Sequence, residues 1–340
     1  MEAPVRVAII GAGFMGSLYG RICNQMCGVE VTAVCDIALP AAEKAAGECG
    51  ARAYTDSTRM LEQEPSDAVL VCTPEDAHCD PTLSALAAEK HVMVEKPLAA
   101  NVAEATLMER AAFDRTNLVC MTAHSLRFDP RYAALRESVA SGQIGDIINV
   151  AARRTPPFTA LERVRGRTEL PFWVGVHDID MMHWVVQSDV SRVVAVSTGI
   201  GLEAGGLKRA ILATLVFATG TIAMLDNSWG PHCESPAVLS TAEFRVQGTR
   251  GAAVVTAHEQ GLSLRCGPDI SVPDTVYIHA IHGRIAGVYA NQMQHFIDCI
   301  RQRKPAQVTF RDGLEAVRVA DAILRALRTS APVVISEATN

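Results

Sequence analysis

The sequence predicts an α/β fold made of two domains: an N-terminal parallel sheet flanked by helices, and a C-terminal α+β domain with an open, mainly antiparallel sheet. Three observations support this prediction. Short apolar runs alternate with helical stretches over the first ~140 residues. A glycine-rich turn follows the first of these runs. From about residue 146, glycine turns join the apolar runs, as in β-hairpins. A chain of 340 residues also suits two cores better than one.

Composition limits the classes of partner. Hydrophobic residues make up 49% of the chain and charged residues 20%, as in an ordinary globular protein. The net charge of −6 argues against nucleic acid or an anionic membrane as the main partner. No apolar run reaches the ~18 residues of a membrane span. The first strand is expected too close to Met1 for a signal peptide, and the ten cysteines contain no C-x-x-C pair. We therefore expect a cytoplasmic protein.

The first domain is expected to cover residues 1–124 and to begin with a strand over Val5–Ile10. This strand leads directly into a G-x-G-x-x-G motif, and the next strand, expected over Val29–Cys35, ends in Asp36 about twenty residues later. Strand, glycine turn, helix, second strand and terminal acid in this order predict a Rossmann dinucleotide-binding domain. The free N–H groups of the helix would face the pyrophosphate. The candidate pyrophosphate-binding residues are Gly11, Gly13, Phe14, Met15 and Gly16.

Asp36 decides which dinucleotide is expected. Its carboxylate can accept hydrogen bonds from both hydroxyls of the adenosine ribose, and its charge repels a 2′-phosphate. Ile37 and Ala38 supply no cation that would offset this repulsion. We therefore expect NAD as the cofactor, with NADP less favoured.

The later strands of this domain are expected over residues 68–72, 91–94 and 118–123, with helices over 77–89 and 102–116. Asn101 is the expected N-cap of the second helix, with Glu104 as its capping-box partner. In an open parallel sheet, ligands bind beyond the carboxyl ends of the strands. The residues that follow these strands are therefore candidate site residues: Thr73, Pro74, Glu95, Lys96 and His124.

Lys96 is the candidate for acid/base chemistry. A lysine at this place would be desolvated and close to the positively charged nicotinamide ring, which favours its neutral form. It could then take a hydroxyl proton while hydride leaves the same carbon. Pro97 would hold Lys96 in an extended conformation. The alternative is a surface lysine at the end of a strand.

The second domain is expected to cover residues 125–340, with its sheet starting at about residue 146. Strands are expected over 147–152, 192–198, 212–217, 221–227, 243–247 and 252–256, and helices over 175–187, 288–303 and 311–329. Residues 154–170, with two prolines and four arginines, are expected to form a loop at the domain junction. We expect no metal site, because His177, Asp178 and Asp180 do not share one helix face.

Together these motifs resemble the Gfo/Idh/MocA oxidoreductase family, whose members are NAD(P)-dependent dehydrogenases of sugars, cyclitols and related polyols. The resemblance begins with the glycine turn and Asp36 and continues along the whole chain. It is carried further by Thr73-Pro74 with His78, Glu95-Lys96-Pro97, Arg127-Phe128-Asp129-Pro130-Arg131-Tyr132, Gly142-Gln143-Ile144-Gly145 and His177-Asp178-Ile179-Asp180.

The resemblance implies roles for single residues in the cofactor groove. Thr73, Pro74 and His78 would line this groove, although Glu75 stands where the family usually has asparagine, and a polar residue at a helix N-terminus explains His78 equally well. Glu95 and Lys96 would flank the nicotinamide.

The resemblance also implies substrate contacts. Lys96 would act as acid/base and His177 would assist it. Arg127 would lie near the floor of the substrate pocket, or it would be an ion-pair partner at the domain seam. His124 and Arg154 are further candidates for substrate binding. His124 could equally be a hydrogen-bonded structural residue, and arginines such as Arg154 more often form structural ion pairs.

Trp173 departs from the pattern of the family's myo-inositol dehydrogenases. In those enzymes an aspartate lies four residues before the histidine that corresponds to His177, and both hydrogen-bond the polyol. Tryptophan stacks on the apolar face of a pyranose and cannot accept a hydrogen bond. We therefore expect Trp173 to bind a substrate other than free myo-inositol, with Trp229 closing the pocket from the sheet side; the alternative is that Trp173 is a core residue.

These features predict an NAD-dependent dehydrogenase that oxidises a ring hydroxyl of a cyclic polyol, sugar or glycoside. Family precedent implies a homodimer or homotetramer formed through the C-terminal sheet. Two other functions stay open: an NAD-dependent glycosidase or elimination enzyme that recycles its cofactor, and a non-catalytic sensor of the NAD redox state. The presence of Lys96 and His177 argues against the sensor, which needs neither.

Overall fold

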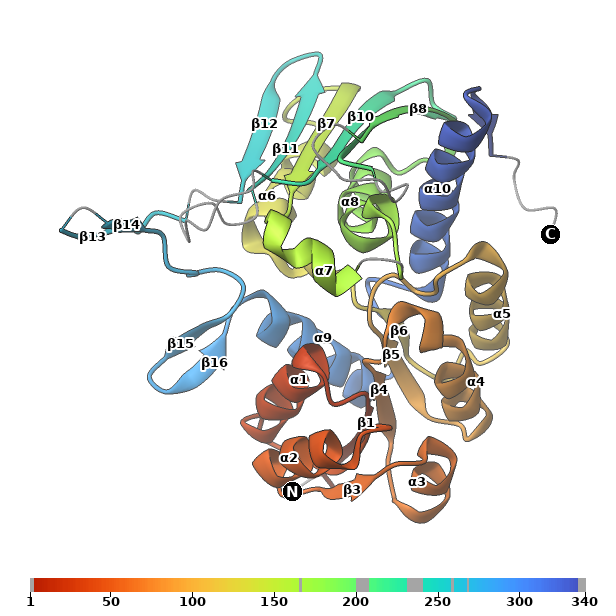
Figure 1. Cartoon of the computed structure of the whole chain (residues 1–340), viewed down its shortest axis with the longest axis vertical. Coiled ribbons are helices and arrows are strands. Elements are labelled where there is room, and N and C mark those ends of the chain that lie inside the picture. Colours follow the sequence, from red (N-terminus) through yellow and green to blue (C-terminus); the bar gives the residue numbers. More distant parts are fainter. Residues whose placement is uncertain are drawn as a thin grey trace. The chain divides into compact units, whose positions relative to one another are not determined.

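The computed structural model describes residues 3–164, 167–199, 208–230, 241–257, 260–267 and 269–335. The chain forms two compact units (Figure 1). The first is drawn from residues 1–128 and 277–314, and the second from residues 129–276 and 315–340. A late stretch of the chain therefore joins the N-terminal unit. The expected division of the sequence after residue 124 stays a prediction.

The first unit contains a parallel six-stranded sheet with the order β3-β2-β1-β4-β5-β6. Its strands are β1 (Val5–Ile10), β2 (Val29–Cys35), β3 (Arg52–Tyr54), β4 (Ala68–Val71), β5 (His91–Val94) and β6 (Cys120–Thr122). The strand order reverses at β1 and β4, which is where doubly wound sheets bind ligands. This topology confirms the predicted Rossmann domain.

The helices of this unit account for the burial of the central strands of its sheet. They are α1 (Phe14–Asn24), α2 (Leu39–Cys49), α3 (Ser57–Gln63), α4 (Cys79–Ala87), α5 (Val102–Phe113) and α9 (Val288–Gln302). Every residue of β4 is buried, as expected for a parallel strand with both faces covered. The Asn101 side chain accepts a hydrogen bond from the Glu104 N–H at 2.9 Å, which confirms the predicted N-cap of α5.

The second unit contains a seven-stranded sheet with the order β12-β11-β7-β10-β9-β8-β17. Its strands are β7 (Ile147–Thr155), β8 (Val190–Thr198), β9 (Ala210–Phe217), β10 (Ile222–Ser228), β11 (Thr241–Gly248), β12 (Ala252–Thr256) and β17 (Val333–Val334). β7 and β10 run parallel, and the other neighbours run antiparallel. The sheet is therefore mainly antiparallel, as predicted.

The helices of the second unit are α6 (Pro130–Ala140), α7 (Leu161–Val164) and α8 (Val176–Val186), while α10 (Phe310–Thr329) passes from the first unit into the second. The loop predicted over residues 154–170 is partly wrong. β7 continues to Thr155, and a 3₁₀ turn and α7 follow it. Arg154 extends the strand because its buried side chain has a partner within the unit, which periodicity of apolar residues does not reveal.

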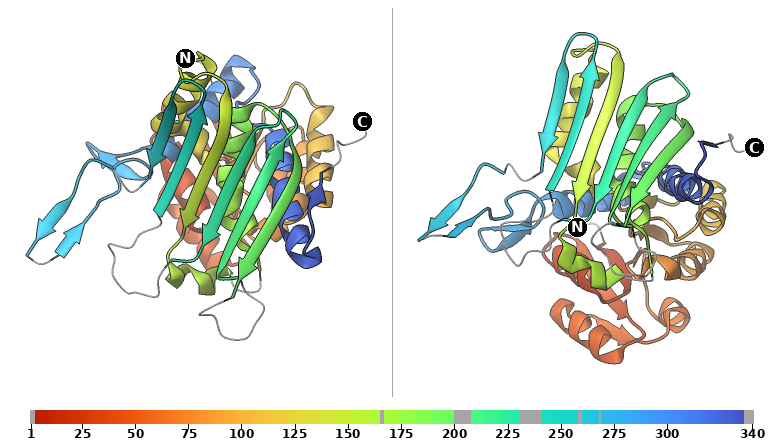
Figure 2. Two further views of the ribbon diagram at one scale, coloured as in Figure 1. Left: turned by 90° about the horizontal axis from the view of Figure 1, so that it is seen from above. Right: turned by 45° about the horizontal axis from the view of Figure 1, so that its top comes forward.

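One face of the seven-stranded sheet carries exposed apolar side chains. Along β9 and β10, buried and more exposed residues alternate, and β8 ends in three exposed residues. The left view of Figure 2 looks onto the strands of this sheet. The exposed apolar residues on these three strands are Val194, Val196, Leu212, Ile222 and Met224. We call this set the open face.

Two small hairpins complete the fold: β13 (Leu264–Cys266) with β14 (Asp269–Ser271), and β15 (His279–Ile281) with β16 (Arg284–Ala286). The side chain of Gln25 anchors the second hairpin through both backbone groups of Ile285, at 2.6 and 2.8 Å. Among the described residues, no helix combines the length and the apolar character needed to cross a membrane.

Candidate functional site

The turn after β1 places its three glycines in different surroundings. Gly11 has a φ of +99°, and a Cβ there would lie 2.5 Å from the backbone of Cys72. A Cβ on Gly16 would overlap the carbonyl oxygen of Gly11. In contrast, a Cβ on Gly13 would meet no protein atom within 4 Å. The protein itself therefore requires Gly11 and Gly16, whereas Gly13 leaves space on the outer side of the turn.

Helix α1 begins directly after this turn. Its N-cap is Gly13, which provides no side-chain acceptor, and its first turn contains no acidic residue. Phe14 is exposed, whereas Met15 is half-buried and contacts the apolar core of the first unit. The N–H groups of the first turn and the positive end of the helix dipole are therefore suited to a phosphate.

The Asp36 carboxylate contacts the glycine turn. One oxygen accepts a hydrogen bond from the Ala12 N–H at 2.8 Å, and the other accepts one from the Ala38 N–H at 2.9 Å. The structure therefore brings together the acid and the turn that the sequence motif relates. A carboxylate oxygen has two lone pairs, so each oxygen retains acceptor capacity for a ribose hydroxyl.

His78 connects the loops that follow β4 and β5. Its imidazole is buried, with Nδ1 2.9 Å from the carbonyl oxygen of Pro97 and Nε2 2.9 Å from that of Thr73. The Thr73 hydroxyl donates to the carbonyl of Ala77 at 2.9 Å, and the exposed Pro74 lies between these contacts. His78 thus lies between the two loops, and each neutral tautomer donates a hydrogen bond to a carbonyl oxygen of one of them.

Glu95 and Lys96 lie at the carboxyl end of β5. One oxygen of the buried Glu95 accepts a hydrogen bond from the Tyr19 hydroxyl at 2.7 Å, and the other accepts one from the Lys96 N–H at 3.1 Å. Burial raises the pKa of Glu95, and the Lys96 charge and the Tyr19 hydrogen bond oppose this rise. Lys96 itself is half-buried. A buried acid therefore sits beside the predicted acid/base.

Arg127 forms an ion pair within the first unit. Its guanidinium donates to Asp312 at 2.8 Å and to the carbonyl oxygen of Gln307 at 2.9 Å. Burial works to raise the pKa of Asp312, but the Arg127 charge and hydrogen bonds from Thr309 outweigh it, and the net pKa is lowered. This contact matches the ion-pair alternative for Arg127, while substrate binding by Arg127 stays a prediction. His124, after β6, is buried.

In the second unit, Arg154 pairs with Asp178. The two side chains are buried and form two parallel hydrogen bonds of 2.8 Å, from Nε to Oδ2 and from Nη2 to Oδ1. Such bidentate pairs are among the stronger contacts in proteins. The pair joins β7 to α8, so the structure shows a structural role for Arg154, and its predicted contact with substrate stays a prediction.

Trp173 and His177 lie on consecutive segments of the second unit. Trp173 belongs to the π-helical turn η4 (Pro171–Gly175), and His177, half-buried, follows in the first turn of α8. The Trp173 ring stacks on Trp229, with centroids 5.1 Å apart and planes inclined by 28°. Trp229 is buried and Trp173 is half-buried. The structure thus brings together the two tryptophans that the sequence made candidates for one pocket.

The start of α8 packs tightly on β10. A Cβ on Gly175 would overlap the side-chain oxygen of the fully buried Asn227. Further along the helix, the His183 ring contacts the carbonyl oxygen of Ile179 at 3.0 Å. Within the described part of the chain, no group of three or more histidine, cysteine, aspartate or glutamate side chains is placed to hold a metal ion.

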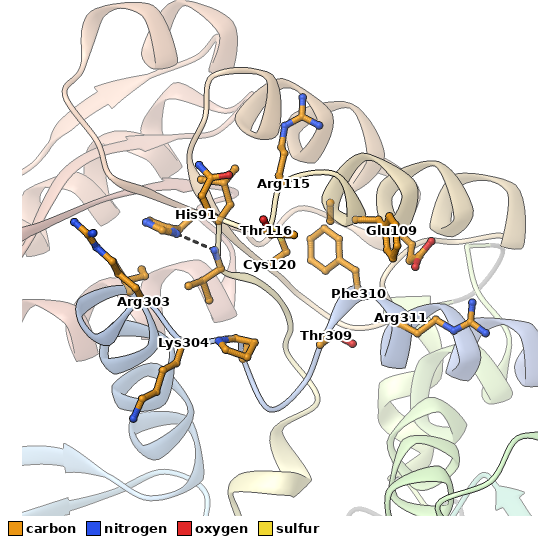
Figure 3. Close-up of a pocket in the computed structure, with 18 residues that line it drawn as sticks. His91, Glu109, Arg115, Thr116, Cys120, Arg303, Lys304, Thr309, Phe310 and Arg311 are labelled. Atoms are coloured by element: carbon orange, nitrogen blue, oxygen red, sulfur yellow. Dashed lines mark hydrogen bonds between the residues drawn. The ribbon is translucent and has the colours of Figure 1, made fainter. Parts of the chain in front are cut away.

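A separate pocket of about 770 Å³ lies in the first unit where β5 and β6 begin, at the edge of the sheet opposite Glu95. Phe310 and Cys120 lie near its centre, while the charged groups of Arg115, Lys304 and Arg311 point away from it (Figure 3). None of the site residues predicted from sequence belongs to its lining. Because these three charged groups point in different directions, they do not converge on one ligand.

No sequence motif indicates Tyr19 or Gln292, although the Tyr19 hydroxyl contacts both Glu95 and Gln292. The Tyr19 hydroxyl lies 3.4 Å from the side-chain oxygen of Gln292. Neither residue belongs to a motif, and Gln292 is far from Glu95 along the chain. What marks Gln292 is that its polar side chain occupies a fully buried position of helix α9.

Comparison with known proteins adds two family models that match the chain. The first is described as an oxidoreductase family with an NAD-binding Rossmann fold, and it matches residues 5–124. The second is described as the C-terminal alpha/beta domain of the same oxidoreductase family, and it matches residues 136–335.

Individual proteins resemble the chain along nearly its whole length. Myo-inositol 2-dehydrogenase of Thermotoga maritima is 25% identical over 346 residues, covering 98% of this chain and 99% of the relative. A crystal structure of myo-inositol 2-dehydrogenase from Lactobacillus plantarum has a TM-score of 0.86 at 23% identity, covering 98% and 100% of the two chains. Scyllo-inositol dehydrogenase from Lactobacillus casei, with bound NAD(H) and scyllo-inositol, has a TM-score of 0.85 at 21% identity, covering 97% and 99%. These structures share the fold of this chain.

Proposed function

The chain belongs to the Gfo/Idh/MocA family of NAD-binding oxidoreductases, and from this premise we propose that it oxidises a ring hydroxyl of a cyclic polyol, sugar or glycoside with NAD as the hydride acceptor. The observation that carries this proposal is the position of Lys96. It follows β5 at the carboxyl edge of the sheet, beside the buried acid Glu95 and in the same unit as the glycine turn.

The residues of the first unit fit a dinucleotide. The space outside Gly13 and the uncapped first turn of α1 suit a pyrophosphate, and the remaining acceptor capacity of Asp36 suits the ribose hydroxyls. Thr73, Pro74 and Glu95 complete the proposed groove, and the imidazole of His78 packs between the two loops that carry them. When bound there, NAD supplies the acceptor for the hydride.

In the proposed reaction, Lys96 takes the hydroxyl proton of the substrate. The carbinol C–H bond breaks and its hydride leaves, the O–H proton passes to the Lys96 amine, and a carbonyl group forms. In the reverse direction the Lys96 ammonium returns the proton. We assign His177 to hold the reacting hydroxyl, because its half-buried imidazole at the start of α8 has both donor and acceptor capacity.

Trp173 and Trp229 support a substrate with an apolar ring face. The half-buried Trp173, four residues before His177, stacks on the buried Trp229 and gives this segment an aromatic surface. The face of a pyranose ring packs on such a surface, and an indole ring offers no acceptor to a hydroxyl. We therefore propose a sugar or glycoside in preference to free myo-inositol. The relatives named as inositol dehydrogenases support the broader class of cyclic polyols.

We further propose that two or more copies of the chain associate through the open face. Five apolar side chains with relative exposures between 42% and 62% lie on three adjacent strands of one sheet. Contiguous apolar surface of this kind marks protein–protein contacts more often than free surface.

The test is to record NADH formation spectroscopically with a panel of inositols, sugars and glycosides and with NAD⁺ or NADP⁺. Steady NADH growth with one compound would support a dehydrogenase. With that compound, Lys96→Ala is expected to lower turnover by about 10²–10⁴-fold, the usual contribution of a general base. The exposed Lys304→Ala, at the opposite edge of the sheet, serves as the matched control.

Three outcomes would contradict the proposal. Full turnover by Lys96→Ala would remove the assigned acid/base. Cleavage of a glycoside without net NADH would point to the glycosidase or elimination enzyme. Binding of NAD without conversion of any compound would favour the redox sensor.

A further inference from the structure

Tyr19 is a buried polar group for which the proposed reaction has so far assigned no role. Tyr19 is 0% exposed, and it lies in α1 just after the glycine turn. Its hydroxyl donates to Glu95, which is 9% exposed, at 2.7 Å. A buried tyrosine hydroxyl needs a partner, and a carboxylate is a strong one. The chain thus places this hydroxyl on the acid that precedes Lys96.

Three elements of the first unit meet at this contact. Tyr19 comes from α1, Glu95 from the end of β5, and the fully buried Gln292 from α9. Tyr289, one turn before Gln292, packs edge-on against the Tyr19 ring, with centroids 6.3 Å apart. The ring of Tyr19 is therefore held from the side of α9, and its hydroxyl is held on Glu95.

The groups around Glu95 determine what Tyr19 does there. Burial disfavours the carboxylate, while Lys96, the Tyr19 hydrogen bond and His78 favour it. Burial and the neighbouring Glu95 raise the pKa of Tyr19 and of Cys72 well above their usual values. Both therefore stay neutral near pH 7, and Tyr19 keeps the proton that it donates.

The second oxygen of Glu95 links this contact to Lys96. It accepts the Lys96 N–H at 3.1 Å, so the two oxygens face donors on different elements. Removing the Tyr19 hydroxyl would leave one oxygen of a buried carboxylate without this donor. The carboxylate would then take up a proton more readily or rotate, and both changes disturb its contact with Lys96.

We propose that Tyr19 is a positioning residue for the reaction: its hydroxyl keeps the Glu95 carboxylate ionised and directed at the backbone of Lys96, and so holds Lys96 in place. This inference rests on the proposed role of Lys96. The consequence is that Tyr19 controls the charge beside the acid/base without touching the substrate.

The first experiment measures thermal unfolding of Tyr19→Phe across about pH 5–8. Glu95 has a raised pKa in the folded state, so its native form loses stability as pH rises through that pKa. The Tyr19 hydroxyl stabilises only the ionised form. The difference in Tm between wild type and Tyr19→Phe is therefore expected to be small at the acidic end and to grow with pH.

Tyr54→Phe is the matched control. Its hydroxyl also donates to a glutamate, Glu64, at 2.5 Å, and this hydrogen bond lowers the pKa of Glu64. Glu64 is therefore ionised throughout about pH 5–8, and the effect of Tyr54→Phe on Tm is expected to stay constant over this range. In a Glu95→Gln background, the effect of Tyr19→Phe should lose its pH dependence.

The second experiment follows turnover. Tyr19→Phe is expected to lower kcat on the order of tenfold, to change KM little, and to alter the acid side of the pH profile, because loss of one hydrogen bond to a charged group has this magnitude. A Tm difference that is flat with pH, together with an unchanged pH profile of kcat, would overturn the proposal.

The two readouts separate this inference from the proposed function. If Lys96→Ala keeps full turnover, the role of Lys96 fails, whatever Tyr19→Phe does. If Lys96→Ala is inactive and Tyr19→Phe behaves like Tyr54→Phe in both experiments, the Tyr19 inference alone is wrong. The unfolding measurements need no substrate and decide whether Tyr19 controls the ionisation of Glu95.

Discussion

Asp36 connects the two backbone segments of the nucleotide-binding turn through a single carboxylate. Its oxygens accept the N–H groups of Ala12 and Ala38, so its position is set before any ligand arrives. A preorganised acceptor loses less freedom on binding than a mobile one. This geometry supports the role that the sequence motif predicts for Asp36.

Replacing Asp36 with alanine is expected to abolish the preference for NAD over NADP. The variant loses charge-assisted hydrogen bonds worth about 1.5–3 kcal/mol to the ribose, so NAD affinity should fall by at least about tenfold. NADP affinity should change much less, because the charge that repels its 2′-phosphate is also lost. Calorimetric titration with both dinucleotides measures the ratio.

Asp36→Asn is the control for the backbone contacts of Asp36. It keeps one acceptor oxygen but removes the charge, and it should shift the ratio in the same direction. An unchanged ratio of affinities in both variants would show that Asp36 does not select the cofactor.

Arg127 and Arg154 show what residue type alone leaves undecided. The sequence offered each arginine as a substrate contact or a structural ion-pair partner. The structure shows both in ion pairs, with Asp312 and Asp178 respectively. A buried charge without a partner is strongly unfavourable, so the choice depends on which carboxylate the fold brings near. That choice is made by tertiary contacts between distant positions.

In the glycine turn, the fold requires Gly16, whereas Gly13 leaves space for a ligand. Gly16→Ala places a Cβ on the carbonyl oxygen of Gly11 and is expected to destabilise the protein by about 1–3 kcal/mol or more. Gly13→Ala meets no protein atom and should change stability by less than about 1 kcal/mol, as an N-cap substitution without a clash.

The same pair of variants tests the pyrophosphate site. Gly13→Ala fills the space outside the turn, so NAD affinity should fall at least about tenfold while the urea midpoint stays near wild type. Equal NAD binding by Gly13→Ala and wild type would mean that the pyrophosphate does not approach this turn. Urea unfolding and NAD titration on the same samples give both quantities.

Periodicity predicted most elements but failed where the chain lacks it. β3 has three residues and no apolar run, and it forms because it pairs with β2. Arg154 continues β7 because Asp178 neutralises it inside the second unit. A periodic pattern predicts a strand where the side chains face an apolar core. It therefore does not predict a short edge strand, or strand residues whose side chains form a buried ion pair.

For the whole molecule, the open face is the feature with the clearest consequence. Val196→Glu combined with Met224→Glu places one charge on β8 and one on β10, the two strands that flank β9 in the open face, and it is expected to convert an oligomer into monomers. Because both side chains are about half or more exposed, the fold of each copy should persist. Light scattering after size-exclusion chromatography gives the mass, and circular dichroism checks the fold.

Leu107→Glu is the matched control for this experiment. Leu107 is a comparably exposed apolar residue on α5, in the first unit, and its replacement should leave the oligomer intact. A wild-type protein that is monomeric, or a double variant with an unchanged oligomeric mass, would contradict the assignment of the open face.

The sequence by itself determined the features that depend on neighbouring residues. These are the Rossmann turn with Asp36, the alternation of strands and helices, the capped start of α5 and the motif at Glu95-Lys96-Pro97. Each follows from backbone freedom, periodicity or a hydrogen bond within a few residues, so it is readable without knowledge of the fold.

Only the tertiary structure decided which polar groups meet. It placed Tyr19 on Glu95, Gln292 on Tyr19, Asp312 on Arg127 and Asp178 on Arg154, and it stacked Trp173 on Trp229. It also joined residues 277–314 to the N-terminal unit. The physical reason is that burial makes an unpaired polar group costly but does not specify its partner, and that partner is fixed when distant segments pack together.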